Sequence, residues 1–145
     1  MKAAVAKAQQ SANALPGKVG VVGFSLGGGQ VLGYASRWPD RVAVVVAMYP
    51  LTRLFKDIPA TVGRIKVPVL MFAGEKDTFK DCCLIETARA IASSAAASNA
   101  PLELVTYPNV GHDFIVGGRY YDGKAATDAW TRTAAMLKQH LSDAP

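Results

Sequence analysis

A serine with the surroundings of a nucleophile follows the apolar run Val19–Phe24, in the sequence GFSLG that has Ser25 at its centre. This GxSxG pattern is typical of a sharp turn from a strand into a helix, which holds the serine in a strained backbone conformation at the carboxyl end of the strand. Such a turn needs small residues on both sides, and Gly23 and Gly27 supply them. The chain has 13 glycines, so the pattern predicts chemistry only if a base and an acid are found elsewhere.

The expected base is a histidine, because a serine hydroxyl is a weak nucleophile until a neighbouring group accepts its proton. Two histidines are present. His140 lies near the end of an amphipathic pattern, where a solvated histidine at a helix terminus is the plain interpretation. His112 lies in a loop at the carboxyl end of the strand expected over 102–107. Because parallel strands end at the same edge of a sheet, His112 is the predicted partner of Ser25.

The acid should follow another strand at the same edge. The apolar run at 67–73 ends in the sequence GEKD, which places Asp77 four residues beyond the last apolar position. The order serine, acid, histidine is the one expected when the three residues follow successive strands of an α/β-hydrolase sheet. Asp77 is therefore the predicted acid. Asp113 is a rival that adjoins the predicted base in sequence, and Glu75 and Asp81 are weaker candidates.

The spacing of apolar residues predicts helices that alternate with strands. The unbroken apolar run at 42–48 is typical of a strand buried on both faces, which indicates a parallel sheet. Four parallel strands in βα units place active residues at their carboxyl ends. With 145 residues, 50% of them hydrophobic, the chain fits one α/β domain over 1–145.

The expected elements are as follows. Strands are expected at 19–24, 42–48, 67–73 and 102–107. Helices are expected at 4–15, 26–37, 82–98 and 124–141, with a loop and a turn of helix between 51 and 66. The last helix is expected to bury a face made of Ala126, Trp130, Ala134, Leu137 and Leu141.

Three motifs fall in the order of a known family: GFSLGGG around Ser25, GEKD ending at Asp77 and GHDF around His112. The sequence resembles the dienelactone hydrolase branch of the α/β-hydrolases, and residues 121–133 are similar to the segment that leads into the family's last helix. The resemblance extends over nearly the whole chain but over only the second part of the family's usual length. It implies a truncated α/β-hydrolase fold of about four parallel strands with flanking helices, and an oxyanion held in part by the Leu26 N–H.

Two departures from the family concern the substrate. The family carries cysteine at the nucleophile position, where this chain has Ser25, which favours a general ester hydrolase over a dedicated lactonase. The family's arginine for the substrate carboxylate corresponds to Val116 here, which argues against an anionic, dienelactone-like substrate. Arg119 is close enough in the same loop to compensate, although a solvated arginine is the plainer interpretation.

The predicted activity is that of a serine carboxylesterase, which hydrolyses short-chain acyl esters through an acyl-enzyme. Aromatic residues near the strand ends are expected to line a shallow acyl pocket; these are Tyr49, Phe79 and Phe114, together with Phe24 and Phe55. The alternatives are a small-lactone or thioester hydrolase and a hydrolase-fold scaffold or subunit without catalysis. The presence of all three triad residues, framed by glycines, favours an enzyme.

The loop that donates the second oxyanion amide in the family has no counterpart in this sequence. We expect a substitute donor from the loop 49–56, from the amino-terminal segment or from a second chain. The strand at 19–24 is also expected to lack a neighbour on one side, and an apolar unpaired edge favours association. The sequence therefore predicts a homodimer or larger homo-oligomer that covers this edge or the helices beside it.

Composition argues against several partners. The 16 basic residues outnumber the 11 acidic ones, giving a net charge of +5. They are scattered singly, so nucleic acid is not a predicted partner. No stretch approaches the length of a membrane span, so a membrane is not a predicted partner either. No cofactor is expected, because the second strand ends in Tyr49 and Pro50 where a dinucleotide site would need an acidic residue. Polar residues interrupt the apolar amino-terminal stretch, so the expected location is cytoplasmic.

The two cysteines, Cys82 and Cys83, are adjacent. Neighbouring cysteines do not easily bridge each other, and this pair matches no metal-binding spacing. We therefore expect them to pack at the start of a helix, and we expect no metal site.

Overall fold

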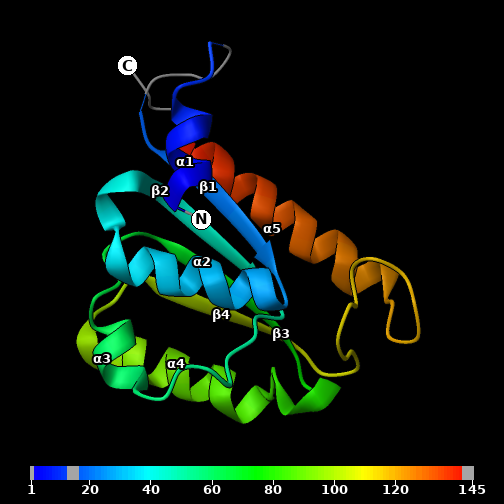
Figure 1. Cartoon of the computed structure of the whole chain (residues 1–145). Coiled ribbons are helices and arrows are strands. Elements are labelled where there is room, and N and C mark those ends of the chain that lie inside the picture. Colours follow the sequence, from blue (N-terminus) through cyan, green and yellow to red (C-terminus); the bar gives the residue numbers. More distant parts are fainter. Residues whose placement is uncertain (1, 13–16, 142–145) are drawn as a thin grey trace.

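A parallel sheet with helices on both faces makes up the fold, as seen in a computed structural model that describes residues 2–12 and 17–141 (Figure 1). The strands are β1 Val19–Phe24, β2 Val42–Met48, β3 Val69–Gly74 and β4 Leu102–Tyr107. The α-helices are α1 Lys2–Gln9, α2 Leu26–Arg37, α3 Ile58–Val62, α4 Ile85–Ser98 and α5 Gly123–Leu141, and short 3-10 helices occur at η1 Pro39–Arg41 and η2 Phe79–Asp81.

The sheet has the order β1-β2-β3-β4, with every strand parallel to its neighbour. This confirms the predicted class of four parallel strands with flanking helices. The two central strands are the apolar ones, and β3 is buried along its whole length. The outer strands β1 and β4 are mostly half-buried, because each pairs on one side only.

The strand register brings the four carboxyl ends to one edge of the sheet. Phe24 at the end of β1 pairs with Met48 at the end of β2. Gly74 at the end of β3 pairs with Tyr107 at the end of β4. The loops that follow these strands therefore begin beside one another, which is the arrangement that the sequence order of the candidate triad required.

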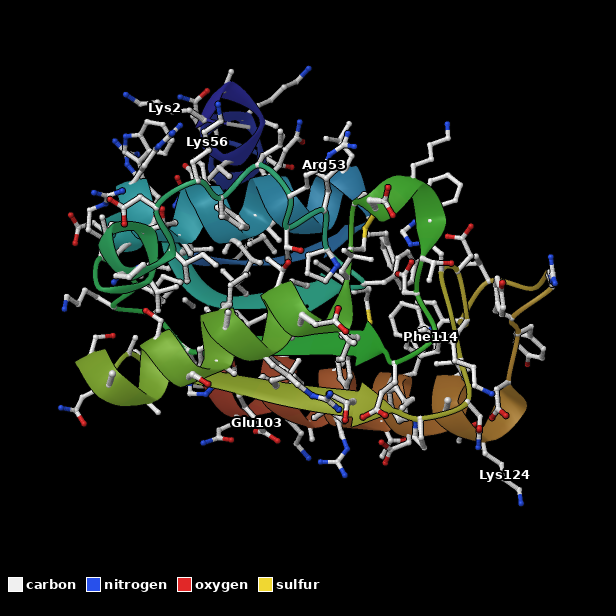
Figure 2. All side chains as sticks on the ribbon, turned by 90° about the horizontal axis from the view of Figure 1, so that it is seen from below. Lys2, Arg53, Lys56, Glu103, Phe114 and Lys124 are labelled. Carbon is white, nitrogen blue, oxygen red and sulfur yellow. A yellow bond between two sulfur atoms is a disulfide. The ribbon has the colours of Figure 1, made fainter. Side chains whose placement is uncertain are left out.

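Helices α1 to α4 pack on one face of the sheet, and α5 packs on the other together with the loop residues Val110, Phe114 and Ile115. In Figure 2 Phe114 lies inside the molecule, whereas Lys2 and Lys124 point outward. The two cores share no side chains, because β2 and β3 turn alternate residues to opposite faces. The candidate site lies where the α5-side core reaches the carboxyl edge.

Several predicted boundaries were wrong. Helix α1 ends at Gln9 and not near position 15, which lies outside the described residues. Helix α4 begins at Ile85 and not at Cys82, because the chain first forms η2 and then an extended residue, Leu84, at the helix N-cap. The turn of helix expected between 51 and 66 is α3.

The buried face of α5 also differs from the prediction. Its buried residues are Ala125, Ala126, Ala129 and Thr133, whereas Trp130 is 44% exposed. The helix is thus rotated relative to the expected stripe. Because β1 is an edge strand, no element covers the flank of α5 beyond it within the described residues, and Trp130 lies on that flank.

None of the helices in the described ranges is both long and apolar enough to span a membrane.

A polar contact ties α5 to the edge strand β4. The Tyr107 hydroxyl donates to Asp128 Oδ2 at 2.7 Å, and Arg132 Nε donates to the same oxygen at 2.8 Å. These two hydrogen bonds lower the pKa of Asp128. The contact is therefore present at neutral pH and is lost as the pH falls through the pKa of Asp128 in the folded protein.

We expect Tyr107→Phe to lower the free energy of unfolding at neutral pH by roughly 1–2 kcal/mol, less than most hydrogen bonds to charged groups contribute, because the Asp128 side chain is 43% exposed. Urea titrations at neutral and acidic pH would measure the difference, which should shrink in acid. Tyr121→Phe, at a tyrosine that is 55% exposed, is the matched control and should have no effect. Equal stability of the two variants would contradict the contact's role.

Candidate active site

Ser25 occupies a strained turn between β1 and α2, with φ 49° and ψ −115°. Its backbone is held on both sides: its N–H donates to Met48 O at 3.0 Å, and its carbonyl accepts from Gly29 N at 3.1 Å and Leu51 N at 2.8 Å. This is the geometry expected of a nucleophile elbow. The strain is maintained because the end of β2 and the following loop fix the turn from outside.

Close backbone packing explains most of the glycines around this turn. A Cβ on Gly23 would lie 2.4 Å from Gly27 O, one on Gly28 would lie 2.8 Å from Pro50 Cα, and one on Gly29 would lie 2.3 Å from Leu51 O. Gly27 itself has open space around its Cβ position. A side chain is therefore excluded at Gly23, Gly28 and Gly29. The expected need for a small residue at Gly27 is wrong, because a Cβ there would meet no other atom.

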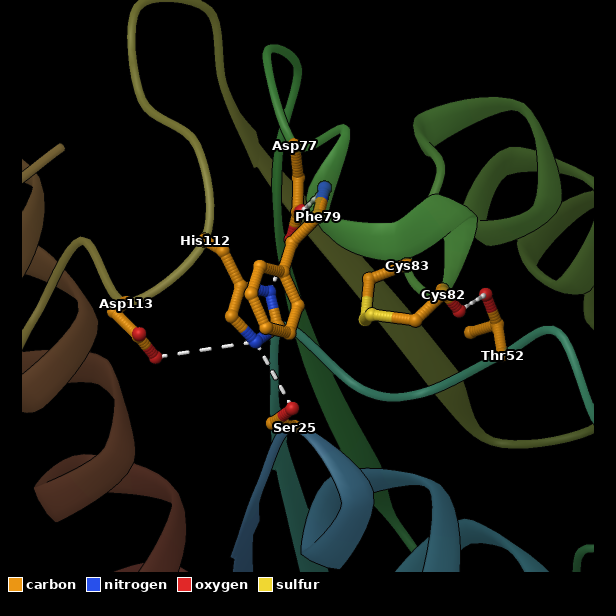
Figure 3. Close-up of polar contacts among 8 residues, drawn as sticks. All are labelled: Ser25, Thr52, Asp77, Phe79, Cys82, Cys83, His112 and Asp113. Atoms are coloured by element: carbon orange, nitrogen blue, oxygen red, sulfur yellow. Dashed lines mark hydrogen bonds and ion pairs between the residues drawn. A yellow bond between two sulfur atoms is a disulfide. The ribbon is translucent and has the colours of Figure 1, made fainter.

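His112 lies between Ser25 and Asp77 in the structure (Figure 3). Its Nε2 is 2.9 Å from Ser25 Oγ, and its Nδ1 is 2.8 Å from Asp77 Oδ2. His112 is 7% exposed and Asp77 is 2% exposed, so the bond between them is shielded from water, whereas the bond to Ser25 is only partly buried. With the proton on Nδ1, the imidazole donates to Asp77 and its Nε2 can accept the serine proton.

Loop contacts fix the acid in place. The second carboxylate oxygen of Asp77 accepts from Phe79 N at 3.1 Å. Lys76 N donates to Val110 O at 3.0 Å, which joins the loop after β3 to the loop that carries His112. A Cβ on Gly74 would lie 2.5 Å from Val110 O, so a glycine there allows the two loops to meet.

Asp113, the rival acid, lies near the Nε2 side of the imidazole, whereas Asp77 lies at Nδ1. Its Oδ1 is 3.9 Å from His112 Nε2, and its side chain is 56% exposed. Burial, the Asp113 charge and a hydrogen bond to Asp113 raise the pKa of Tyr49 to about 12, so the Tyr49 hydroxyl stays protonated beside this carboxylate. Asp113 thus faces the serine side of the ring and not Nδ1.

The other titratable candidates lie away from the site. Glu75 accepts from Arg89 at 2.7 Å, and Asp81 is an exposed residue of η2. His140 is in the last turn of α5, as the sequence indicated.

The aromatic residues around His112 divide into covered and open ones. Phe79 stacks on the imidazole with ring centroids 4.6 Å apart, and it is 46% exposed. Tyr49 meets the imidazole edge-on at 4.8 Å but is only 2% exposed. Phe114 is completely buried beneath Tyr49 and Tyr107. The expectation that Phe114 lines a pocket is therefore wrong, because the residue belongs to the core that supports the site.

An aromatic pair that the sequence did not bring together lies beside Tyr49. Phe24, 37% exposed, is 6.3 Å from Tyr49 and 6.1 Å from Trp130, measured between ring centroids. Trp130 was assigned to a core-facing stripe, and only the edge position of β1 could have indicated that it meets Phe24. These rings form an apolar surface next to the nucleophile.

A cavity of about 410 Å³ runs along α2, separate from the side chains of the candidate triad. Leu26 lies at one end, and Phe55, expected in the acyl pocket, lines it with Leu51 and Leu54. Neither Ser25 nor His112 contributes to its walls. The cavity therefore adjoins the Ser25 turn through Leu26, Gly29 and Leu51, and not through the side chains of Ser25 or His112.

The predicted oxyanion donor is the Leu26 N–H. Leu26 is the first residue of α2, so its N–H has no partner within the helix. The loop 49–56 offers little more, because its amides at positions 49, 51, 52, 53, 55 and 56 each donate to a carbonyl. Pro50 has no N–H, which leaves only Leu54, an exposed residue. Most N–H groups of this loop are thus unavailable to an oxyanion, because they already donate to carbonyls.

The loop after His112 contains Val116, at the position of the family's substrate-binding arginine, and Arg119, which was considered as a substitute. Val116 is 64% exposed. The Arg119 guanidinium lies over the Tyr120 ring at 5.5 Å, so its described partner is an aromatic ring and not a group of the triad.

The cysteines correct an expectation, because Cys82 and Cys83 form a disulfide with each other. The pair lies in the turn between η2 and α4 and not inside a helix. The expected packing is present, since both residues are buried. The expectation that adjacent cysteines would not bridge each other was wrong, and the bond lies at a bend of the chain.

Comparison with known proteins adds a family to this geometry. The profile of the dienelactone hydrolase family matches residues 1–141. The chain therefore belongs to the dienelactone hydrolase family.

Individual relatives agree with this assignment. Protein usf of Aquifex pyrophilus is 32% identical over 129 residues, which are 88% of this chain and 53% of that protein. A carboxymethylenebutenolidase of Rhodococcus opacus is 30% identical over 131 residues, 85% of this chain and 50% of that protein. The chain thus spans about half the length of these relatives.

The fold is also found among solved structures. A dienelactone hydrolase-like promiscuous phosphotriesterase from metagenomic libraries superposes with a TM-score of 0.79 at 21% identity, covering 96% of this chain and 59% of that one. The α/β-hydrolase topology is common to both.

The glycine geometry gives a matched test of the turn. We expect Gly23→Ala to lower the free energy of unfolding by more than about 2 kcal/mol, because its Cβ would collide with backbone atoms. Gly27→Ala should be neutral or slightly stabilising, since its Cβ has room and alanine favours a helix over glycine by about 1 kcal/mol. Urea unfolding followed by circular dichroism would compare them. Similar losses in both variants would contradict this description of the turn.

Proposed function

We propose that this chain hydrolyses short-chain carboxylic esters by a serine mechanism. The hydrogen-bonded line from Asp77 through His112 to Ser25 is the observation that supports the proposal most directly. Membership of a hydrolase family supports the reaction class. The serine in place of the family's cysteine favours ordinary esters, whose alkoxide leaving groups suit an attack assisted by a general base.

The proposed reaction has two halves. Ser25 Oγ attacks the ester carbonyl while His112 Nε2 takes its proton, and Asp77 stabilises the resulting imidazolium. The Leu26 N–H stabilises the negative oxygen of the tetrahedral intermediate. The alcohol leaves with the proton from His112, and water then hydrolyses the acyl-enzyme by the same route in reverse.

The size of the expected rate depends on the oxyanion site. Loss of one donor typically lowers turnover about a hundred- to a thousandfold. The second donor in our proposal comes from a partner chain, because most amides of the loop 49–56 are engaged, and α1 contacts Trp38 at the end of α2 that lies away from Ser25.

A cyclic ester is the second candidate substrate. The Rhodococcus opacus relative is described as a carboxymethylenebutenolidase, and the same serine attack would open a small lactone ring. Val116 in place of a carboxylate-binding arginine favours uncharged over anionic lactones. Thioesters follow the same chemistry with a better leaving group.

The decisive experiment is hydrolysis of p-nitrophenyl acetate and butyrate by the wild type and Ser25→Ala. We expect Ser25→Ala to lose at least about a thousandfold in kcat/KM, because the nucleophile is removed. Ser93→Ala, on the exposed surface of α4, is the matched control and should retain activity.

Circular dichroism must first establish that all three proteins are folded. Equal background rates in the wild type and Ser25→Ala would overturn the esterase proposal and favour the scaffold alternative.

We also propose that the chain forms a homodimer through the β1 edge. In support, β1 pairs with β2 alone among the described strands, and the exposed rings of Phe24 and Trp130 lie beside this edge. A self-complementary pairing would cover the unpaired backbone and the aromatic surface together.

Light scattering at micromolar concentration should give about twice the chain mass of 15.3 kDa. Trp130→Glu should shift the protein to the monomer, because it places a charge in the apolar contact. Lys124→Glu, an exposed change at the start of the same helix, should leave the mass unchanged. A monomeric wild type would contradict the dimer.

A further inference from the structure

A disulfide lies against the imidazole of the proposed base, although the hydrolysis mechanism gives it no role. Cys82 is 4% exposed and Cys83 is 3% exposed. Figure 3 shows the disulfide and Asp113 to either side of His112. The Sγ atoms of Cys82 and Cys83 and a ring nitrogen of His112 all lie within 4.8 Å of one another. The two sulfurs and the imidazole come from segments about thirty residues apart, so sequence spacing could not reveal the cluster.

The backbone holds this cluster together independently of the S–S bond. The carbonyl of Cys82 accepts from Thr52 N at 2.9 Å, from Arg53 N at 3.0 Å and from Thr52 Oγ1 at 3.4 Å. The Cys82 N–H donates to Phe79 O at 3.0 Å. Thr52 is almost fully buried. These bonds do not involve the sulfurs, so reduction of the disulfide leaves both thiols next to His112.

We infer that the reduced chain holds a binding site for a thiophilic divalent cation of the Zn²⁺ class, formed by the Cys82 and Cys83 sulfurs and one ring nitrogen of His112. Zn–S bonds are about 2.3 Å and Zn–N bonds about 2.0–2.1 Å, so tetrahedral ligands stand roughly 3.5–4 Å apart. The existing spacing permits this once the sulfurs separate. Two thiolates and an imidazole are a set that zinc prefers, and the fourth position is left for water.

The electrostatic surroundings favour a cation at this position. The Asp77 carboxylate is 2.8 Å from the imidazole and that of Asp113 is 3.9 Å from it. The half-exposed Phe79 ring covers one face of the imidazole, so a movement of this side chain would open the route from solvent.

The redox and binding steps balance as follows. A dithiol reductant gives two electrons and two protons to the Cys82–Cys83 bond, and becomes a disulfide itself. Binding of Zn²⁺ then displaces the two thiol protons, while the neutral imidazole donates a lone pair. Whichever ring nitrogen binds the metal, His112 gives up its bond to Ser25 or to Asp77.

The site therefore links redox state to catalysis, a consequence that rests on the esterase function proposed above. With the disulfide intact no thiolate is available, and the triad stays assembled. In the reduced state the cation competes with Ser25 or Asp77 for His112 and stops hydrolysis. Removal of the cation should restore activity without reoxidation.

Metal binding is tested first, because it needs no catalytic activity. The full chain, reduced with a water-soluble phosphine, is titrated with Zn²⁺ and separately with Co²⁺. We expect an equimolar amount of Zn²⁺ to bind, and the Co²⁺ complex to show the near-ultraviolet absorption of a thiolate-bound metal. The untreated, disulfide-bonded chain should bind neither tightly.

Variants identify the ligands. His112→Ala, Cys82→Ser and Cys83→Ser should each weaken Zn²⁺ binding more than about a hundredfold. Loss of a residue that merely hydrogen-bonds to a metal ligand already lowers metal affinity about ten- to a hundredfold. His140→Ala, at the other histidine of the chain, is the matched control and should bind like the wild type. Ser25→Ala should also bind, which separates the metal site from the nucleophile. Circular dichroism on each reduced variant verifies the fold, and alkylation of the reduced wild type with iodoacetamide gives a mutation-free test of the thiols.

Three results would overturn the inference. The reduced wild type could fail to bind Zn²⁺, His112→Ala could bind as tightly as the wild type, or the disulfide-bonded chain could bind equally well. Ester hydrolysis supplies the last measurement, with each protein compared with its own metal-free rate: Zn²⁺ should inhibit the reduced wild type and not the oxidised one. If no protein hydrolyses esters, the esterase proposal fails while the binding results still decide the metal site.

Discussion

The turn at Ser25 is the constraint on which the rest of the site depends. Its unfavourable backbone conformation persists because three backbone hydrogen bonds, to Met48, Gly29 and Leu51, hold it from three directions. These partners belong to β2, α2 and the next loop, so the proposed nucleophile is positioned only when β1 and β2 are paired in the correct register. The glycines at positions 28 and 29 let the loop approach α2 closely enough to make these bonds.

The imidazole is positioned by a different device, the meeting of two loops after β3 and β4. Asp77 is held by the Phe79 amide, His112 is held between Asp77 and the stacked Phe79 ring, and Phe114 fills the space below. Backbone hydrogen bonds thus position Ser25, whereas side-chain packing positions His112. The side-chain packing also contains the disulfide, so the redox effect inferred above would reach the proposed base, His112, without moving the turn at Ser25.

Much of this arrangement was predictable from the sequence because it depends on order and periodicity. Apolar runs located the four strands, the chain order of Ser25, Asp77 and His112 followed from successive strand ends, and glycines flagged the turn. The failures have physical causes in tertiary context. The exposure of Trp130 depends on β1 being an edge, the burial of Phe114 depends on the loop folding under Tyr49, and the Cys82–Cys83 bond depends on a local change of chain direction. Distances through space, unlike periodicity, leave no local pattern in the sequence.

The order of the strands in the sheet equals their order in the chain, and this has a consequence for how the protein acquires its structure. Every described strand pairs with the one before it in the chain, so no crossover has to pass over another strand of the sheet. The candidate triad, in contrast, depends on a long-range contact, since Ser25 and His112 are 87 residues apart in sequence. A partly grown sheet would already contain a complete nucleophile turn but no base. Reactivity of Ser25 toward an acylating reagent would thus appear only when the last strand has joined, which makes the serine an internal reporter of finished folding.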